Sequence, residues 1–282
     1  MHKDSNKYVK KAIDEDIGSG DYTTQATVKP NLKGSARIIS KQSGIIAGTT
    51  IAEHVFKTAD PQLLVTIYYR DGNFLHGNES VMLIKGNVNF ILSAERTALN
   101  YLAHLSGIAT LTGKFVNEIK GTKAKITDTR KTTPLLRAME KEAVKAGGGI
   151  NHRMGLYDMI LIKENHIRAA GGIVYAVKQT RRFLKEMKLN LLIEVETRAL
   201  PDVREALTCA IDRIMLDNMN SDEVREAVHL VNKQVDLEAS GGITLENVRE
   251  IAETGVDYIS IGALTHSAPA FDFSLLLDNP ES

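Results

Sequence analysis

The chain has 282 residues, of which 43% are hydrophobic and 25% are charged, a composition ordinary for a globular protein with a substantial core. Lysine plus arginine equals aspartate plus glutamate at 35 each, so no net charge directs the chain to nucleic acid or an anionic membrane. The single cysteine, Cys209, excludes an internal disulfide framework. No apolar stretch is long enough to predict a transmembrane helix or a secretory signal, so we expect a cytoplasmic protein.

The first hundred residues predict an α+β arrangement rather than a regular series of βαβ units. Short helices are expected over residues 6–16 and 49–58. Strands with a mixed or alternating pattern are expected over 35–40, 63–69 and 81–85, as in a sheet with one solvated face.

Residues 89–120 carry apolar side chains at a mostly helical spacing. Gly107 and Gly113 are expected to divide this region into two helices. The region would join the two halves of the chain.

The second half contains six short apolar runs, each ending in a polar or glycine cluster. They begin near residues 125, 159, 191, 213, 235 and 258, and helical segments such as 134–146, 173–187, 199–210, 222–232 and 245–254 lie between them. Buried parallel strands look like short apolar runs, and in α/β barrels the reactive groups follow the strands. The sequence therefore predicts a barrel whose active site is formed by these clusters.

Cations follow the first two runs. Arg130 and Lys131 come after the first, while His152 and Arg153 follow three glycines just before the second. Lys163 closes the second run and has three readings: an ion pair that makes partial burial tolerable, a Schiff-base lysine, or a permanent cation for an anionic substrate. The neighbouring arginines favour the third reading.

Carboxylates and glycines follow the later runs. Glu194 and Glu196 lie two apart and so share one face of a strand, and Asp217 is expected in the equivalent place on the next strand. Such carboxylates suit Mg²⁺, although ion pairs with the cations are an equal use for them. The glycine-rich loops 240–244 and 262–265 suggest that the last strands bind phosphate.

Several of these segments together resemble one family. They are Glu95–Asn100 with His104–Thr110, Thr127–Pro134, Gly147–Gly149 with His152-Arg153, Lys163–His166, Glu194–Glu196 and Ser240–Ile243. In this order they resemble quinolinate phosphoribosyltransferase, also called nicotinate-nucleotide pyrophosphorylase (carboxylating). The resemblance covers essentially the whole chain.

The resemblance implies an α/β fold, with an N-terminal α+β sandwich domain followed by an incomplete, seven-stranded TIM-like α/β barrel. The expected domains are 1–110, with the tail 268–282 packing on it, and 111–267. The family is a pentosyltransferase. Its reaction converts quinolinate and phosphoribosyl pyrophosphate, with Mg²⁺, into nicotinate mononucleotide, pyrophosphate and CO₂ for NAD biosynthesis.

The resemblance also assigns the site. Catalytic roles fall on Lys131, Lys163, Glu194 and Asp217, and the last two face the metal, directly or through water. The substrate-binding set is Arg96, Thr129, Arg130, Lys131, His152, Arg153, Lys163, Glu194, Asp217, Ser240, Gly241, Gly242, Ile261, Gly262 and Ala263. Arg96 would come from the neighbouring subunit of a homodimer, with a hexamer left open.

Two residues depart from the family pattern. Leu135 stands where glycine is common and is expected to serve helix packing, and Glu164 replaces a common aspartate beside Lys163. The alternatives are a related phosphoribosyltransferase for nicotinate or another aromatic acid, a Schiff-base lyase using Lys163, and a ligand-binding relative without catalysis.

Overall fold

The computed structural model describes residues 5–278, and contacts within the chain divide it into two compact units. Unit 1 comprises Met1–Gly113, Thr133–Gly148 and Leu264–Ser282, and unit 2 comprises Lys114–Thr132 and Gly149–Ala263. The division differs from the expected domains of 1–110 and 111–267, because a piece from the middle of the chain joins unit 1. Residues 1–4 of the expected first domain and 279–282 of the expected tail lie outside the described residues.

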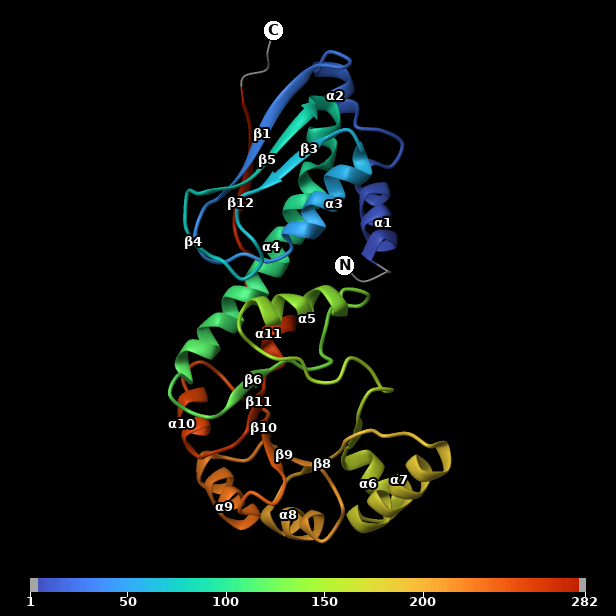
Figure 1. The fold of residues 1–282 in the computed structure, drawn as a ribbon, viewed down its shortest axis with the longest axis vertical. Coiled ribbons are helices and arrows are strands. Elements are labelled where there is room, and N and C mark those ends of the chain that lie inside the picture. The colour runs from blue at the N-terminus through green and yellow to red at the C-terminus, as the bar shows by residue number, and fades with distance from the viewer. Residues whose placement is uncertain (1–4, 279–282) are drawn as a thin grey trace. The chain divides into compact units, whose positions relative to one another are not determined.

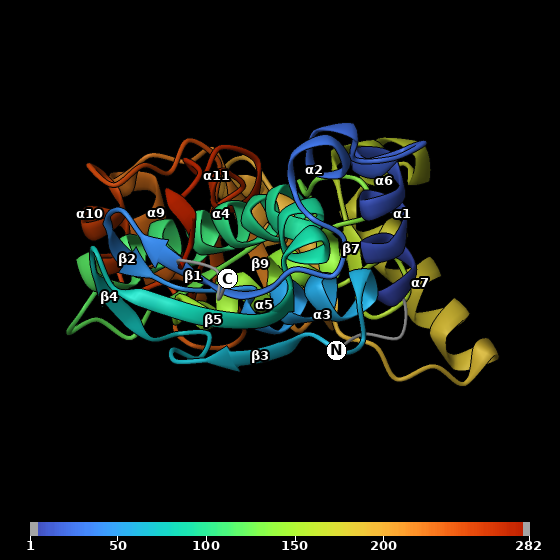
Figure 2. The same cartoon turned by 90° about the horizontal axis from the view of Figure 1, so that it is seen from above.

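Unit 1 is built on a four-stranded antiparallel sheet in the order β12-β1-β5-β3. Its strands are β1 (Lys33–Ser40), β3 (Leu64–Ile67), β5 (Ser80–Asn87) and β12 (Phe273–Leu277), and a separate hairpin pairs β2 (Ser43–Ile45) with β4 (Phe74–His76). The helices are α1 (Ser5–Ile17), α2 (Tyr22–Thr27), α3 (Thr49–Ala59), most of α4 (Val88–Glu118), α5 (Arg137–Ala146) and α11 (Ala263–His266). Figure 2 shows α4 running along one face of this sheet.

Helix α4 is continuous, so the expected break at Gly107 and Gly113 is wrong. A Cβ atom on Gly107 would lie 2.2 Å from the carbonyl oxygen of Pro269, and one on Gly113 would lie 2.5 Å from the side chain of Ile45. These glycines let neighbouring segments approach the helix closely. They do not interrupt it.

Unit 2 alternates strands and helices, as the apolar runs predicted (Figure 1). The strands are β6 (Lys125–Thr127), β7 (Ile160–Ile162), β8 (Ile193–Thr197), β9 (Arg213–Asp217), β10 (Asp236–Ser240) and β11 (Tyr258–Ser260). The helices are α6 (Glu164–Ala170), α7 (Ile173–Met187), α8 (Leu200–Leu207), α9 (Ser221–Val231) and α10 (Val248–Glu253).

The six strands form one parallel sheet in the order β6-β11-β10-β9-β8-β7. A seventh segment is reduced to a single parallel bridge between Ile150 and Thr127 of β6. The fold class is confirmed, with the seventh strand of the incomplete barrel represented by this bridge. No helix within residues 5–278 is long and apolar enough to cross a membrane.

Two boundaries differ from the sequence prediction. Strand β8 runs from Ile193 to Thr197, so it begins two residues later than the apolar run, and Glu194 and Glu196 lie within it as expected. Helix α5 begins at Arg137 instead of Pro134. Leu135 has a positive φ of 69° and is 68% exposed, so its expected role in helix packing is wrong.

Candidate active site

The polar side chains of unit 2 occupy two levels on one face of the parallel sheet. Directly paired residues of neighbouring strands share a face, and the register pairs Glu194 with Arg213, and Ser240 with Asp217. We call His152, Glu194, Arg213 and Glu238 the inner cluster. The edge layer is Lys163, Glu196, Asp217 and Ser240, which lie at or next to the carboxyl ends of the strands.

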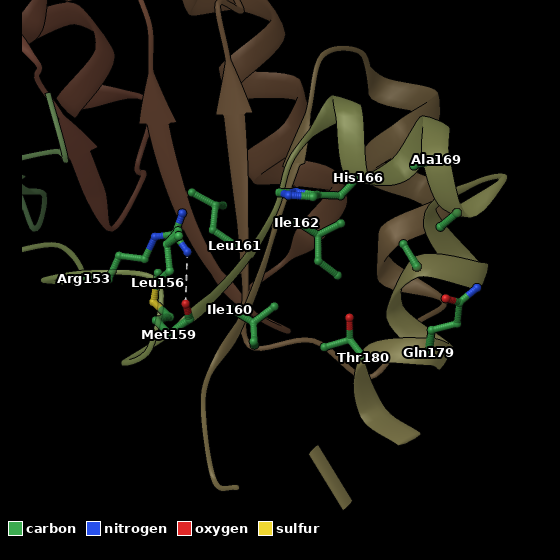
Figure 3. Close-up of a pocket in the computed structure, with 12 residues that line it drawn as sticks. Arg153, Leu156, Met159, Ile160, Leu161, Ile162, His166, Ala169, Gln179 and Thr180 are labelled. Carbon is green, nitrogen blue, oxygen red and sulfur yellow. Dashed lines mark hydrogen bonds between the residues drawn. The ribbon is translucent and has the colours of Figure 1, made fainter. Parts of the chain in front are cut away.

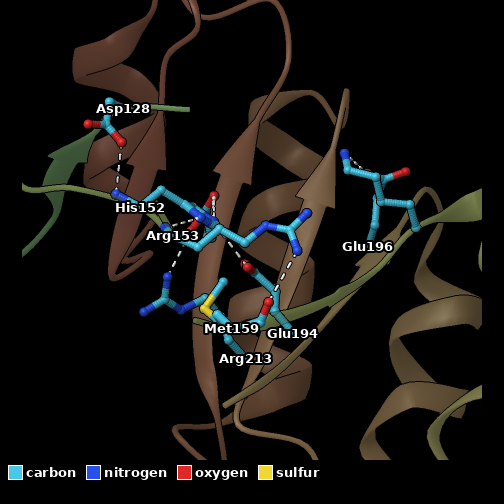
Figure 4. A network of polar contacts seen from close by, with 9 residues as sticks. Asp128, His152, Arg153, Met159, Glu194, Glu196 and Arg213 are labelled. Carbon is cyan, nitrogen blue, oxygen red and sulfur yellow. Dashed lines mark hydrogen bonds and ion pairs between the residues drawn. The ribbon is translucent and has the colours of Figure 1, made fainter. Parts of the chain in front are cut away.

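The inner cluster is a buried network of two carboxylates and two basic groups (Figure 4). His152 Nε2 lies 3.1 Å from Glu194 Oε2 and 3.4 Å from Glu238 Oε1. Arg213 Nη1 donates to Glu238 Oε2 at 3.0 Å, and its guanidinium lies 3.8 Å from the centre of the Tyr258 ring. Both carboxylates are fully buried, so their charges depend on these partners.

The inner cluster retains a proton at neutral pH. Burial lowers the pKa of His152, but hydrogen bonds from the ring to Glu194 and Glu238 outweigh burial and raise that pKa to about 9. Burial and the charge of Glu238 raise the pKa of Glu194 as well. The backbone N–H of Arg153 donates to His152 Nδ1 at 2.8 Å, which favours a lone pair on that nitrogen. We therefore place the proton in the His152–Glu194 pair, shared between the ring and the carboxylate.

Two arginines, Arg130 and Arg153, lie close to each other beside the inner cluster. Arg153 is 9% exposed and donates from Nη1 to the carbonyl oxygen of Met159 at 3.1 Å. Burial and then the charge of Arg130 lower the pKa of Arg153. The buried Nε of Arg130 has no hydrogen-bond partner in the protein. Two cations held this close, one with a spare donor, favour an anionic ligand.

The backbone of this segment is fixed by Asp128. The Asp128 side chain is fully buried and its Oδ1 accepts the N–H of His152 at 2.9 Å. Asp128 directly follows β6, so the contact ties the cation-bearing segment to the sheet.

In the edge layer each carboxylate meets a cation. Lys163 Nζ lies 2.9 Å from Glu196 Oε2, and the backbone N–H of Glu164 donates to the other oxygen at 3.4 Å. Arg198 Nε lies 3.6 Å from Asp217 Oδ2. Figure 4 shows Glu196 set apart from the inner cluster.

The prediction that Glu194 and Asp217 occupy equivalent strand positions is wrong. Glu194 is the second residue of β8 and pairs with Arg213, whereas Asp217 is the last residue of β9. The two are thus separated by about 13 Å along the strands, at about 3.3 Å per residue. They cannot both bind one metal ion directly. Glu196, paired with Met215, lies nearer to the level of Asp217.

The glycine loop after β10 lies beside the end of β9. Gly241 has φ +89°, and a Cβ atom there would lie 2.3 Å from the Asn218 side-chain oxygen. Gly242 has φ +63° with no atom within 4 Å of its Cβ position. Gly242 is therefore favoured by its left-handed backbone alone, whereas Gly241 is required both by its backbone and by the close approach of the Asn218 side chain.

Of the other predicted site residues, Thr129 accepts the backbone N–H of Lys131 at 3.0 Å, and the Lys131 side chain is exposed. Ile261 is buried after β11, and Gly262 and Ala263 follow it. Arg96 lies on α4 of unit 1 with an exposed side chain.

Sequence reasoning missed Glu238 and Arg213 as members of the inner cluster. Both lie inside short strands that otherwise read as apolar. The available signal was a charged residue in a buried strand, where it requires a partner.

A cavity of about 450 Å³ lies between β7 and helices α6 and α7 (Figure 3). Its lining is mainly aliphatic, with Arg153 and His166 as the basic members and no carboxylate. The lining of this cavity therefore differs from the edge layer, which contains the carboxylates of Glu196 and Asp217.

Two family models match almost the whole chain. The C-terminal domain of quinolinate phosphoribosyl transferase matches residues 108–276, and the N-terminal domain matches residues 21–106. The chain belongs to the quinolinate phosphoribosyltransferase family.

Relatives of the family agree over nearly the full length. The chain is 45% identical to quinolinate phosphoribosyltransferase [decarboxylating] 2b, mitochondrial, of Nicotiana tabacum, over 98% of this chain and 82% of that protein. It is 44% identical to the probable nicotinate-nucleotide pyrophosphorylase [carboxylating] of Bacillus subtilis, over 93% of this chain and 89% of that protein. The structure of the nicotinate-nucleotide pyrophosphorylase from Francisella tularensis superposes with a TM-score of 0.92 at 40% identity, covering 97% of this chain and 96% of that one.

Proposed function

We propose that the chain catalyses phosphoribosyl transfer from phosphoribosyl pyrophosphate to quinolinate, with decarboxylation, to give nicotinate mononucleotide, pyrophosphate and CO₂. Membership of the family supports this reaction. The reaction makes the chain a pentosyltransferase of NAD biosynthesis.

The observation that carries the proposal is the pair of arginines beside the inner cluster. Arg130 is close enough to Arg153 for its charge to lower the pKa of that guanidinium. Like charges held together are costly unless a ligand neutralises them, and quinolinate brings two carboxylates. His152 and Lys163 complete this cationic surface.

Asp217 and Glu196 are the carboxylates that suit Mg²⁺ with phosphoribosyl pyrophosphate. Both are at the carboxyl edge, where Glu196 pairs with the half-exposed Lys163 and Asp217 lies beside the half-exposed Arg198. Bound there, Mg²⁺ would neutralise charge on the departing pyrophosphate. Glu194, deeper in the sheet, orients His152 instead of binding the metal directly.

The chain's own residues supply orientation and electrostatic stabilisation. The arginines hold quinolinate so that its ring nitrogen faces the ribose carbon, and the edge carboxylates favour the positive charge that develops on the sugar. Attachment of the ribose makes the ring an electron sink, which eases loss of the carboxylate next to the nitrogen. The glycine loop Ser240–Gly242 lies at the carboxyl edge, where its backbone is proposed to bind phosphate, with Ile261–Ala263 beside it. Thr129 and Lys131, which directly follow the end of β6, are proposed to contact the substrates as well.

Arg96 is proposed to act across a homodimer. Its exposed side chain on α4 is accessible to a neighbouring subunit, which supports this proposal. Two or six subunits are both compatible with that role. The cytoplasm is the proposed location, since a protein with one free cysteine needs no oxidising compartment.

One assay tests the proposal. Purified protein is incubated with phosphoribosyl pyrophosphate, Mg²⁺ and carboxyl-labelled quinolinate, and nicotinate mononucleotide and released CO₂ are measured. Equimolar release of both is expected. Turnover of nicotinate in place of quinolinate, or no product at all, would overturn the proposal.

The structure does not favour the Schiff-base alternative. Lys163 is 48% exposed and ion-paired with Glu196, whereas an imine-forming lysine needs a desolvated amine. Borohydride treatment with quinolinate should therefore leave no adduct on Lys163.

A further inference from the structure

Arg198 lies between two carboxylates at the carboxyl edge of the sheet. Its Nη1 is 2.6 Å from Glu164 Oε2, and its Nε is 3.6 Å from Asp217 Oδ2. Glu164 also receives Arg168 Nη2 on its other oxygen at 3.1 Å. Arg198 therefore neutralises the same carboxylate that is proposed to bind Mg²⁺.

The main chain of Arg198 is held by α8, while its side chain is half-exposed. The N–H groups of Arg198 and Ala199 both donate to Asp202 Oδ2, at 3.1 and 3.2 Å, which ties the residue to the start of α8. The Arg198 side chain is 54% exposed. A half-exposed guanidinium on a fixed backbone can exchange one anionic partner for another at low cost.

An oxygen that pairs with a guanidinium is a poorer ligand for a metal ion, because the two cations repel each other at a shared carboxylate. Once a divalent ion takes Asp217, Arg198 loses that partner but remains next to it. The group then nearest to the ion is the pyrophosphate that the ion carries. A planar guanidinium matches phosphate oxygens bidentately.

We propose that Arg198 is a positioning residue with two partners: it pairs with Asp217 in the substrate-free protein and with the pyrophosphate group once Mg-phosphoribosyl pyrophosphate binds. Glu164 keeps the guanidinium at the site in both states. This inference rests on the proposed function of the edge layer.

The first measurement is Mn²⁺ binding to substrate-free protein. Binding is monitored by the loss of the electron paramagnetic resonance signal of free Mn²⁺. Arg198→Gln should bind Mn²⁺ up to about fivefold more tightly than wild type, the range expected for removal of a partly exposed ion pair. Arg168→Gln is the matched control, because Arg168 pairs with the other oxygen of the same carboxylate, that of Glu164. The control should equal wild type. An Arg198→Gln affinity that does not rise above wild type overturns the inference.

The second measurement is binding of phosphoribosyl pyrophosphate with Mg²⁺ and without quinolinate, by titration calorimetry. Arg198→Gln should bind this substrate about tenfold more weakly, with Arg198→Lys between it and wild type. Opposite changes for Mn²⁺ and for the substrate are the signature, since a merely structural defect would weaken both. Parallel changes overturn the inference. If wild type itself neither binds phosphoribosyl pyrophosphate nor forms product, the proposed function fails; if wild type does both and Arg198→Gln matches it, only the role of Arg198 fails.

Discussion

The imidazole of His152 lies 3.1 Å from the fully buried carboxylate of Glu194, below the carboxyl edge of the sheet. With Glu238 it holds a proton that the unfolded chain would release near pH 6.5, because the His152 pKa is raised to about 9. The folded protein binds more protons than the unfolded chain across that window. The stabilisation from the proton bound at His152 is complete below pH 6.5 and is lost as the pH rises through 9.

We therefore expect the free energy of unfolding to fall between pH 6.5 and 9, with a slope of at most about 1.4 kcal/mol per pH unit from this group. Urea unfolding at several pH values measures it. His152→Gln should flatten the slope, and His54→Gln, on α3 and outside the inner cluster, should retain it. An equal slope in wild type and His152→Gln would contradict the shared proton.

Glu238 should be essential to the stability of unit 2. Glu238→Gln removes the carboxylate that pairs with Arg213 and one of the two that lie beside His152, and loss of one partner of a buried pair costs about 3–5 kcal/mol. The same change at the exposed Glu226 of α9 is the control and should cost less than about 0.5 kcal/mol. Urea unfolding compares the two, and similar losses would show that the inner cluster is not stabilising.

Two glycines of α4 should respond differently to alanine. Gly107→Ala places a methyl group against the Pro269 backbone and should lower the free energy of unfolding by about 2 kcal/mol. Gly113→Ala meets the terminal methyl group of Ile45, which can move, and the gain of about 1 kcal/mol in helix propensity offsets the contact. Thermal unfolding of both variants provides the comparison. Equal changes in the unfolding temperature of the two variants would mean that the Pro269 backbone moves away from the new methyl group as easily as the Ile45 side chain does.

Leu135 should be replaceable with a gain in stability. A side chain at φ 69° costs about 1–2 kcal/mol, and Leu135 is 68% exposed, so little packing offsets that cost. Leu135→Gly should raise the free energy of unfolding by up to about 1 kcal/mol, whereas Leu135→Ala should not, because alanine keeps the Cβ atom. A gain with alanine equal to that with glycine would assign the effect to the leucyl side chain.

Sharing of the active site predicts complementation between inactive variants. Arg96→Ala and Lys163→Ala should each lose activity as homo-oligomers. A mixture refolded or coexpressed together should regain up to about a quarter of wild-type activity, since a hybrid dimer contains one site with both native residues. Activity is compared with that of the separate proteins at the same concentration. A mixture no more active than its components would place Arg96 and Lys163 in the same subunit's site.

Sequence periodicity located all six strands of the parallel sheet but misjudged where charged residues belong. Glu194 was expected on one face of its strand, at the strand's end, because it follows an apolar run. The structure places it inside β8, where the buried carboxylate is stabilised by the ring of His152, from a distant part of the chain. Partners 42 residues apart along the chain are invisible to a local pattern.

The same limit explains the glycines and the edge layer. Gly107 resembles a helix breaker when the helix is considered alone. The structure shows that glycine is required there because the backbone of Pro269 approaches the helix closely. Likewise, the cations after the strands were found from position, but the pairing of Arg198 with Asp217 depends on how two loops fold over adjacent strands. Local chemistry predicts which residues gather at the carboxyl edge. It does not predict which of them meet.

Strand β12 pairs with β1, and Arg37 bonds Asp278 across a separation of 241 residues along the chain. During synthesis on the ribosome, the sheet of unit 1 therefore cannot be completed until β12 has been synthesised, long after β1. Unit 2, whose strands follow one another in sequence, can fold first. Until β12 arrives, β1 presents an unpaired edge to other nascent chains, which makes this interval the time of greatest aggregation risk.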